Sequence, residues 1–285
     1  MERLEDVKDR SFDLCLDLGS GSGSILRAIN RAESLTGNGG GIGGVRKLVQ
    51  VEGSGLTSSL APLDPSPYCT SYTLPSASEG DLPLPFPDCS FDAVLSCLSL
   101  HWINDLPGTL SEANRVLKPD GALLLAVPGG ETLPELRSSL LLAEQERRGG
   151  ITPRVGPFVD VPSVGMLLQR AGFKLPTVDV DTVAVGYPDM FVLMEHLQGM
   201  GEANASAGRE GRGGGDMDVF LSAAAIYGEM YPLEEGEGGV VGGEVVATAQ
   251  VIYAVGWKEH ESQQKPDRRG SGSARIGDVS IEKTE

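Results

Sequence analysis

A glycine at every second position follows an acidic residue in the stretch Asp17–Gly23, which reads D-L-G-S-G-S-G. An apolar run precedes this stretch, and a segment with helical spacing follows it. The dinucleotide-binding pattern G-x-G-x-x-G would require glycine at position 24, where the chain has serine, and no P-loop G-K-[ST] follows. The stretch therefore differs from both phosphate-binding loops. If the stretch binds no ligand, it is a simple glycine turn in a chain with 39 glycines.

An acidic residue at a strand end, followed by glycines and a helix, suits a cofactor that carries both an ammonium and a carboxylate group. Asp17 would bind the ammonium group, directly or through water, and backbone N–H groups at the helix N-terminus would face the carboxylate. Gly19, Gly21 and Gly23 would let the backbone approach the cofactor closely. S-adenosylmethionine carries both groups, so we predict that this stretch is an S-adenosylmethionine loop.

Two further carboxylates are expected beside the same cofactor. Glu52 ends the next apolar run, where a carboxylate accepts the ribose hydroxyls in dinucleotide folds, and its structural alternative is a solvated loop acid. A third acid should lie after the third strand, near the adenine edge. The segment "ASEGDLPLPF" offers Asp81, which we include in the predicted site, or Glu79, which stays open as its alternative.

Four other side chains are candidates for the chemistry. His101 and Trp102 follow the strong apolar run 90–100, at the carboxyl edge where open α/β sheets bind their ligands. The indole would pack on the adenine or wall the acceptor pocket, and the imidazole would act as a base or donor. Alternatively, the indole packs beneath the next helix and the imidazole bonds a backbone carbonyl. Glu131 and Arg137 would line an acceptor pocket or partner groove, or else cap a helix and form a surface ion pair.

The three histidines, at positions 101, 196 and 260, do not suggest a metal site. A non-haem iron site uses two histidines and a carboxylate, and none of these histidines shows H-x-D/E spacing. A site assembled in space from distant residues stays open, but we predict no metal.

Helices and strands must position these residues. Apolar runs of strand length alternate with segments of helical period along the chain. This alternation predicts an α/β fold with a parallel sheet covered by helices. Strands are expected at 12–18, 45–52, 68–74, 90–100, 122–130, 177–185 and 244–257, the last closing the sheet. Helices are expected from 22, at 105–117 with a stop at 118–121, and at 132–148, 161–172, 189–201 and 217–231. Glycine-rich loop insertions are expected at 37–44, 208–216 and 235–243.

This pattern divides the chain into a cofactor-binding core at 11–128, a C-terminal half at 129–257 that completes the sheet and forms the substrate or partner side, and a disordered tail at 258–285. No targeting segment is expected at the acidic N-terminus "MERLEDVKDR", because mitochondrial presequences are poor in acids and secretory signals need an apolar core.

Composition excludes several classes of partner. The net charge of −17 argues against binding to nucleic acid and to anionic lipid, both of which require a basic surface. No apolar run approaches the roughly 20 residues of a membrane span, so any membrane contact would be peripheral. The four cysteines lack C-x-x-C spacing, and Cys15 and Cys97 lie in apolar runs, so we expect buried free thiols in a reducing compartment.

The segment from "LPLPFPDCSFDAVLSCLSL" to "LKPDGALLL" resembles the class I S-adenosylmethionine-dependent methyltransferases of the type 11 group. A more specific similarity, over about residues 12 to 267, is to the family of mitochondrial respiratory complex I assembly factor 5. It rests on "SLSLHWINDLP", "GGETLPELRSSLLLAEQERRGG", "YPDMFVLMEHLQGMGE", "AAAIYGEMY" and "YAVGWKEHESQQKP".

The resemblance implies a Rossmann-like class I methyltransferase sandwich with a mostly parallel seven-stranded sheet and helices on both faces. It also implies S-adenosylmethionine binding, a location on the matrix side of the mitochondrial inner membrane, and hydroxylation of an arginine in a peripheral-arm subunit of complex I. Hydroxylation follows from the resemblance alone, since no residue pattern explains oxygen activation. Two departures from the family are expected: residues 1–11 do not resemble its presequence or its N-terminal helical segment, and Glu52 stands in place of aspartate. The alternatives are a conventional methyltransferase acting on a small molecule, acyl carrier or protein, and a non-catalytic assembly chaperone.

Overall fold

A computed structural model describes residues 12–36, 45–52, 69–73, 83–152, 154–156, 158–202, 217–233 and 244–265 of the chain. Four of the features expected from the sequence lie outside these residues. They are the third cofactor acid (Asp81 or Glu79) and the glycine-rich insertions at 37–44, 208–216 and 235–243.

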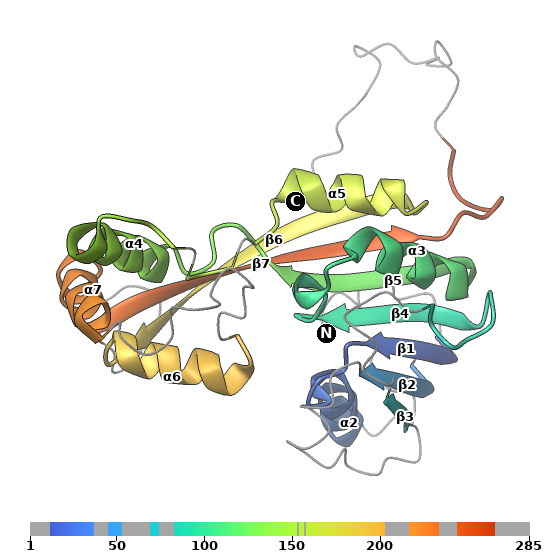
Figure 1. The fold of residues 1–285 in the computed structure, drawn as a ribbon. Helices are drawn as coiled ribbons and strands as arrows, with labels where there is room; N and C mark the ends of the chain where they lie inside the picture. Colours follow the sequence, from blue (N-terminus) through green and yellow to red (C-terminus); the bar gives the residue numbers. More distant parts are fainter. Residues whose placement is uncertain are drawn as a thin grey trace, which may run out of the picture.

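The described strands form a seven-stranded sheet in the order β3-β2-β1-β4-β5-β7-β6 (Figure 1). Their bounds are Leu14–Leu18 (β1), Lys47–Glu52 (β2), Cys69–Thr73 (β3), Phe91–Cys97 (β4), Leu117–Pro128 (β5), Lys174–Tyr187 (β6) and Val245–Trp257 (β7). The first five strands are parallel, and β7 pairs antiparallel with both β5 and β6. The mostly parallel seven-stranded sheet predicted from the sequence is thus confirmed. The last strand completes the sheet by insertion between β5 and β6, which leaves β6 at the edge.

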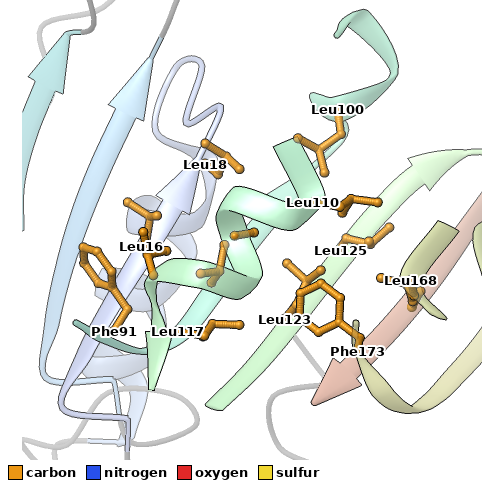
Figure 2. Close-up of a cluster of buried hydrophobic side chains, with 14 of the residues drawn as sticks. Leu16, Leu18, Phe91, Leu100, Leu110, Leu117, Leu123, Leu125, Leu168 and Phe173 are labelled. Atoms are coloured by element: carbon orange, nitrogen blue, oxygen red, sulfur yellow. The ribbon is translucent and has the colours of Figure 1, made fainter. Parts of the chain in front are cut away.

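Helices cover both faces of this sheet. Their bounds are Ser24–Thr36 (α2), Leu100–Trp102 (η3, a 3-10 turn), Leu106–Val116 (α3), Pro134–Arg148 (α4), Val161–Arg170 (α5), Met190–Met200 (α6) and Met217–Met230 (α7). Side chains alternate between the faces along β1. Leu16 packs on the face covered by α3 and α5, which Figure 2 shows, whereas Cys15 packs on the face covered by α2.

The β6–β7 hairpin extends beyond the rest of the sheet. The last β5 residue, Pro128, pairs with Val251, and Val251 pairs with Asp181 on its other side. From there 245–250 and 182–187 continue as a two-stranded ribbon past the carboxyl end of β5. Helices α4, α6 and α7 gather around this ribbon (Figure 1) and build a third apolar core, which we call the lobe. Its buried members include Leu136, Leu193 and Tyr227.

Strand β5 begins earlier than the sequence pattern predicts. Its expected start was Ala122, but Leu117 already pairs with Phe91, so the chain enters the sheet before the Pro-Asp-Gly turn. A bulge opposite Phe91 and Ala93 absorbs the turn. A Cβ at Gly121 would lie 2.8 Å from the Lys118 carbonyl oxygen, which is why glycine is needed there.

Two further expectations differ from the structure. Cys15 is buried, and burial raises the pKa of its thiol to about 12, but Cys97 is exposed because β4 ends at this residue. Residues 258–265, which the sequence assigns to a disordered tail, are held against β5. Lys258 Nζ donates to the Leu117 carbonyl at 2.7 Å, and Gln263 Nε2 donates to Asp120 Oδ1 at 3.0 Å.

None of the helices in the described ranges is long and apolar enough to cross a bilayer.

Candidate functional site

The glycine stretch forms a tight loop between β1 and α2, at the carboxyl edge of the sheet. Gly19, Gly21 and Gly23 all have positive φ angles, of 73°, 52° and 79°, which L-residues rarely adopt. The loop lies against the end of β2, because the N–H group of Gly19 donates to the Val51 carbonyl at 2.9 Å. The alternation of glycines is therefore required by the backbone conformation.

Gly19 is also the point at which the loop contacts the exit of β4. A Cβ at this position would lie 1.7 Å from Ser99 Oγ, so any side chain would collide with Ser99. Nearby, Ser96 Oγ donates to the Leu18 carbonyl at 2.8 Å and fastens β4 to β1. Glycine at position 19 thus brings the segment after β4 directly against the loop.

The Asp17 carboxylate is buried at the end of β1, with 1% of the residue exposed. Its Oδ2 accepts a hydrogen bond from Gln50 Nε2 at 3.2 Å, whereas its buried Oδ1 has no partner among the described residues. Burial raises the pKa of Asp17 to about 7; the Gln50 hydrogen bond opposes this rise and the nearby Glu52 charge adds to it. A buried carboxylate oxygen without a partner is an acceptor that an ammonium group would satisfy.

Glu52 joins the end of β2 to the loop. Its Oε2 accepts a hydrogen bond from the N–H group of Gly21 at 2.7 Å. The structure thus brings together Asp17, Glu52 and the three glycines of the predicted site, and this set fits a ligand with an ammonium group and ribose hydroxyls. The binding roles of these residues, and of Asp81 outside the described residues, stay predictions.

His101 lies in the η3 turn that follows β4. Its Nε2 lies 3.0 and 3.1 Å from the two carboxylate oxygens of Glu202, and its buried Nδ1 has no partner within the described part of the chain. The imidazole therefore pairs with a carboxylate, not with the backbone carbonyl that the structural alternative proposed.

Trp102 is 45% exposed, so its indole is not packed beneath α3. Its ring centroid lies 5.2 Å from that of His101, with the two planes tilted by 44°. The indole is thus available to a ligand at the carboxyl edge of the sheet, as the functional alternative requires.

Sequence reasoning did not single out Glu202. Helix α6 ends at Met200 and is capped by Gly201, whose φ is 87°; the next N–H group, that of Glu202, donates to the Leu197 carbonyl at 2.8 Å. This turn directs the chain from the lobe to His101. Gly201 in "LQGMGE" is the signal in the sequence for a helix end. No signal in the sequence indicates which part of the molecule this helix end contacts.

An apolar cavity of about 180 Å³ lies beside this pair, between η3, α3, α5 and β5. His101 is in its wall, together with apolar side chains such as Leu100, Leu125 and Phe158. Of the site residues, the His101 imidazole lines this apolar cavity, and it connects the cavity to the Glu202 carboxylate and the Trp102 indole that it contacts.

Glu131 and Arg137 lie at the turn between β5 and α4. The Arg137 guanidinium donates to the carbonyl oxygens of Gly130 and Thr132, at 3.5 and 3.4 Å. The Glu131 side chain is exposed, and its backbone N–H donates to Gln250 Oε1 at 3.3 Å. These contacts brace the turn; a role in an acceptor pocket stays a prediction for both residues.

In the part of the chain that the structure describes, no group of three or more His, Cys, Asp or Glu side chains is placed to hold a metal ion.

Comparisons with known proteins agree with the fold. A family model described as a methyltransferase domain matches residues 16–125. A putative methyltransferase structure from Bacillus halodurans superimposes with a TM-score of 0.55 and 17% identity, covering 91% of this chain and 100% of the other. The sheet, its covering helices and the glycine loop therefore form a class I methyltransferase fold.

Two relatives are informative about the family. A malonyl-[acyl-carrier protein] O-methyltransferase of Halorhodospira halophila is 31% identical over 277 residues, which cover 95% of this chain and 82% of the relative. The mitochondrial arginine-hydroxylase NDUFAF5 of Rattus norvegicus is 41% identical over 288 residues, covering 98% of this chain and 73% of the relative. The chain belongs to the family of the mitochondrial arginine-hydroxylase NDUFAF5.

Proposed function

We propose that this chain is an S-adenosylmethionine-binding protein of mitochondrial complex I assembly, and that it hydroxylates an arginine of a peripheral-arm subunit on the matrix side of the inner membrane. The observation that carries the proposal is the 41% identity over 98% of the chain to a relative named as an arginine-hydroxylase. The motifs after β4, which resemble the assembly-factor family, support the same assignment.

The geometry of the loop supports S-adenosylmethionine as the cofactor. Asp17 Oδ1 would accept the ammonium group, the N–H groups of the loop would face the carboxylate, and Glu52 would hold the ribose. Asp81 or Glu79 would contact the adenine. When bound, this cofactor supplies a sulfonium-activated methyl group and a positive charge beside the acceptor.

The protein's contribution to the reaction is to position the arginine and to manage protons beside it. His101 and Glu202 form a pair that can hold a proton at Nε2, and Trp102 can wall the acceptor site. Conversion of C–H to C–OH with O₂ consumes two electrons and two protons and releases one water. An assay of arginine hydroxylation with the purified protein must therefore supply O₂ and an external electron donor.

Conventional methyl transfer is the second candidate function. The Halorhodospira halophila relative, named as a methyltransferase, is 31% identical over 95% of the chain. Methyl transfer is an in-line displacement in which positioning supplies much of the catalysis, so the same residues would suffice without a strong base.

Mass spectrometry of complex I subunits distinguishes these functions in cells that lack the protein and carry either the wild-type gene or Asp17→Asn. We expect an arginine of a peripheral-arm subunit to carry one added oxygen atom with the wild type and to be unmodified with Asp17→Asn. An added methylene group would instead establish methyl transfer. Normal assembly with no modification in either strain would indicate a chaperone.

A matched control is Asp13→Asn, because Asp13 lies just before the same strand and its side chain forms an exposed ion pair with Arg46 at 3.4 Å. Calorimetric titration with S-adenosylmethionine should show weaker binding for Asp17→Asn and for Glu52→Gln, and unchanged binding for Asp13→Asn. Equal affinity of all four proteins would exclude the glycine loop as the cofactor site.

A further inference from the structure

We infer that Glu202 and Trp102 together bind the guanidinium group of the substrate arginine. This inference rests on the proposed function and adds to it the residues that recognise the substrate. Glu202 comes from the end of α6 in the lobe and Trp102 from the turn after β4, so the site would form where the lobe meets the sheet.

Glu202 is held close to the cofactor loop through a series of contacts. Gly19 of the loop abuts Ser99, and His101, two residues after Ser99, contacts both carboxylate oxygens of Glu202. The ribbon of β6 and β7 runs past the carboxyl end of β5, on the side of the sheet where this loop lies. The lobe thus carries a carboxylate over the edge where the cofactor is expected.

The Glu202 carboxylate retains acceptor capacity in this position. A carboxylate offers about four lone-pair sites, and Glu202 shares a single Nε2 of His101 between its two oxygens. In the described ranges, His101 is the only ion-pair partner of Glu202, whose side chain is 26% exposed. Because His101 Nε2 lies almost midway between the two oxygens, the outer lone pairs of the carboxylate remain, and a guanidinium N–H group can donate to one of them.

The surroundings of Glu202 suit an arginine side chain. The indole of Trp102 is 45% exposed and adjoins His101, and guanidinium groups stack on indole faces. Phe158, with its ring centroid 6.4 Å from that of His101, and the apolar cavity offer a surface for the methylene groups. A net charge of −17 favours the approach of a cation.

The competing explanation is that Glu202 only ties the lobe to the sheet through His101. Glu202→Gln separates the two roles, because glutamine retains an oxygen acceptor for His101 but has no charge for a guanidinium group. Glu195→Gln is the matched control, since Glu195 is an exposed glutamate on the same helix and loses the same charge.

Binding is measured with N-acetyl-arginine amide and its neutral counterpart N-acetyl-citrulline amide. The chain has two tryptophans, so the indole N–H signal of Trp102 can be assigned by NMR with Trp257→Phe. We expect the arginine probe, and not the citrulline probe, to shift the Trp102 signal. Glu202→Gln should weaken arginine binding about tenfold, the lower range for hydrogen bonds to charged groups, and Glu195→Gln should leave it unchanged. An unaltered preference for arginine in Glu202→Gln would overturn the inference.

Two further measurements keep the result decisive. If Glu202→Gln lowers the melting temperature, Trp102→Leu replaces it as the test variant, because an exposed indole can be removed without opening the core. This variant lacks the reporter indole, so its binding of the arginine and citrulline probes is measured by calorimetric titration beside the wild type; normal arginine binding by Trp102→Leu would overturn the inference. In turnover assays, Glu202→Gln should raise KM for the protein substrate while S-adenosylmethionine affinity stays constant.

If the wild type modifies arginine and Glu202→Gln has a normal KM, the inference fails and the proposed function stands. If the wild type selects the arginine probe through Glu202 but modifies no arginine, the guanidinium site stands and the proposed function fails.

Discussion

Gly19 combines two constraints that can be separated by mutation. Its φ angle of 73° disfavours any L-residue, and Ser99 Oγ occupies the space that a Cβ would need. Gly21, with a φ angle of 52°, shares the first constraint only, because a Cβ at this position would meet no atom of the described residues within 4 Å. A comparison of the two positions therefore measures the contact between the loop and the exit of β4.

We predict that Gly21→Ala destabilises the protein by about 1–2 kcal/mol, the cost of a left-handed L-residue, and that Gly19→Ala costs clearly more. Chemical denaturation gives both values, and calorimetry should show a larger loss of S-adenosylmethionine affinity for Gly19→Ala. Ser99→Gly in the Gly19→Ala background should restore part of the difference. Equal costs at the two positions would show that Ser99 is not the obstacle.

Asp17 should make both stability and cofactor binding depend on pH. Its pKa in the folded protein is raised to about 7, above an unfolded value of roughly 3.9, so folding takes up a proton between these two values. Stability therefore falls as the pH rises from about 4 through 7, and the fall should be smaller in Asp17→Asn. Thermal denaturation over this range measures it.

The ligand should respond in the opposite direction. Ionised Asp17 attracts the ammonium group, so S-adenosylmethionine affinity should rise several-fold between about pH 6 and about pH 7.5, as the ionised fraction of a group with a pKa of about 7 increases. Calorimetry of Asp17→Asn should give a much flatter profile. A wild-type affinity that does not change with pH would mean that Asp17 does not bind the ammonium group.

Some of the site residues can be predicted from the sequence and others cannot. Asp17 and the three glycines are neighbours in the chain, and their spacing predicts the loop because backbone conformation is a local property. Glu202 pairs with a residue 101 positions away, and this contact depends on how the lobe is placed. No local pattern encodes that placement, so half of the inferred arginine site could not have been predicted.

At the scale of elements, the lobe depends on a buried ion pair. Glu144 of α4 is 2% exposed; it accepts a hydrogen bond from Arg154 Nε at 2.6 Å and another from the N–H group of Thr152 at 2.7 Å. The Arg154 guanidinium also lies 5.1 Å from the ring centroid of Phe220 in α7. One arginine thus joins the segment after α4 to two helices of the lobe.

We predict that Arg154→Leu destabilises the protein by about 3–5 kcal/mol, because it leaves the buried Glu144 charge unpaired. The control is Arg147→Leu, whose exposed pair with Glu146 at 3.7 Å should contribute less than about 1 kcal/mol. Urea denaturation measures both. Glu144→Leu in the Arg154→Leu background should recover much of the loss; failure to recover would assign the cost to packing and not to the charge.

The sequence pattern predicted the seven strands and most helices because hydrophobic periodicity is set by local burial. It did not predict the overhanging ribbon, because the strand expected at 177–185 is shorter than β6 and no local pattern shows where a strand extends past its neighbour. Strands β6 and β7 have 14 and 13 residues, whereas β1 has five, and a strand can pair only where its neighbour continues. The early start of β5 was missed because Pro119 and Gly121 are typical of a turn, and here the turn lies within the strand.

At the scale of the whole molecule, two structural units meet at the proposed arginine site. The sheet with α2, α3 and α5 supplies the loop and His101, and the lobe on the β6–β7 ribbon supplies Glu202 (Figure 1). Both belong to a chain with 40 acidic and 23 basic residues. An arginine-bearing partner would therefore experience attraction from the whole molecule as well as from the site.

We predict that association with a synthetic peptide containing three arginines slows several-fold when ionic strength rises from about 0.05 to about 0.5 M, since the Debye length falls from about 14 to about 4 Å. Stopped-flow fluorescence of Trp102 in a Trp257→Phe background measures the rate. The dissociation rate should change less with salt, because the close contact with Glu202 is screened less than the long-range field.

Glu195→Gln should reduce the association rate only slightly, as one charge among many, whereas Glu202→Gln should mainly raise the dissociation rate. An association rate that is independent of salt would mean that the net charge plays no part in recognition and that the arginine is captured by the local site alone.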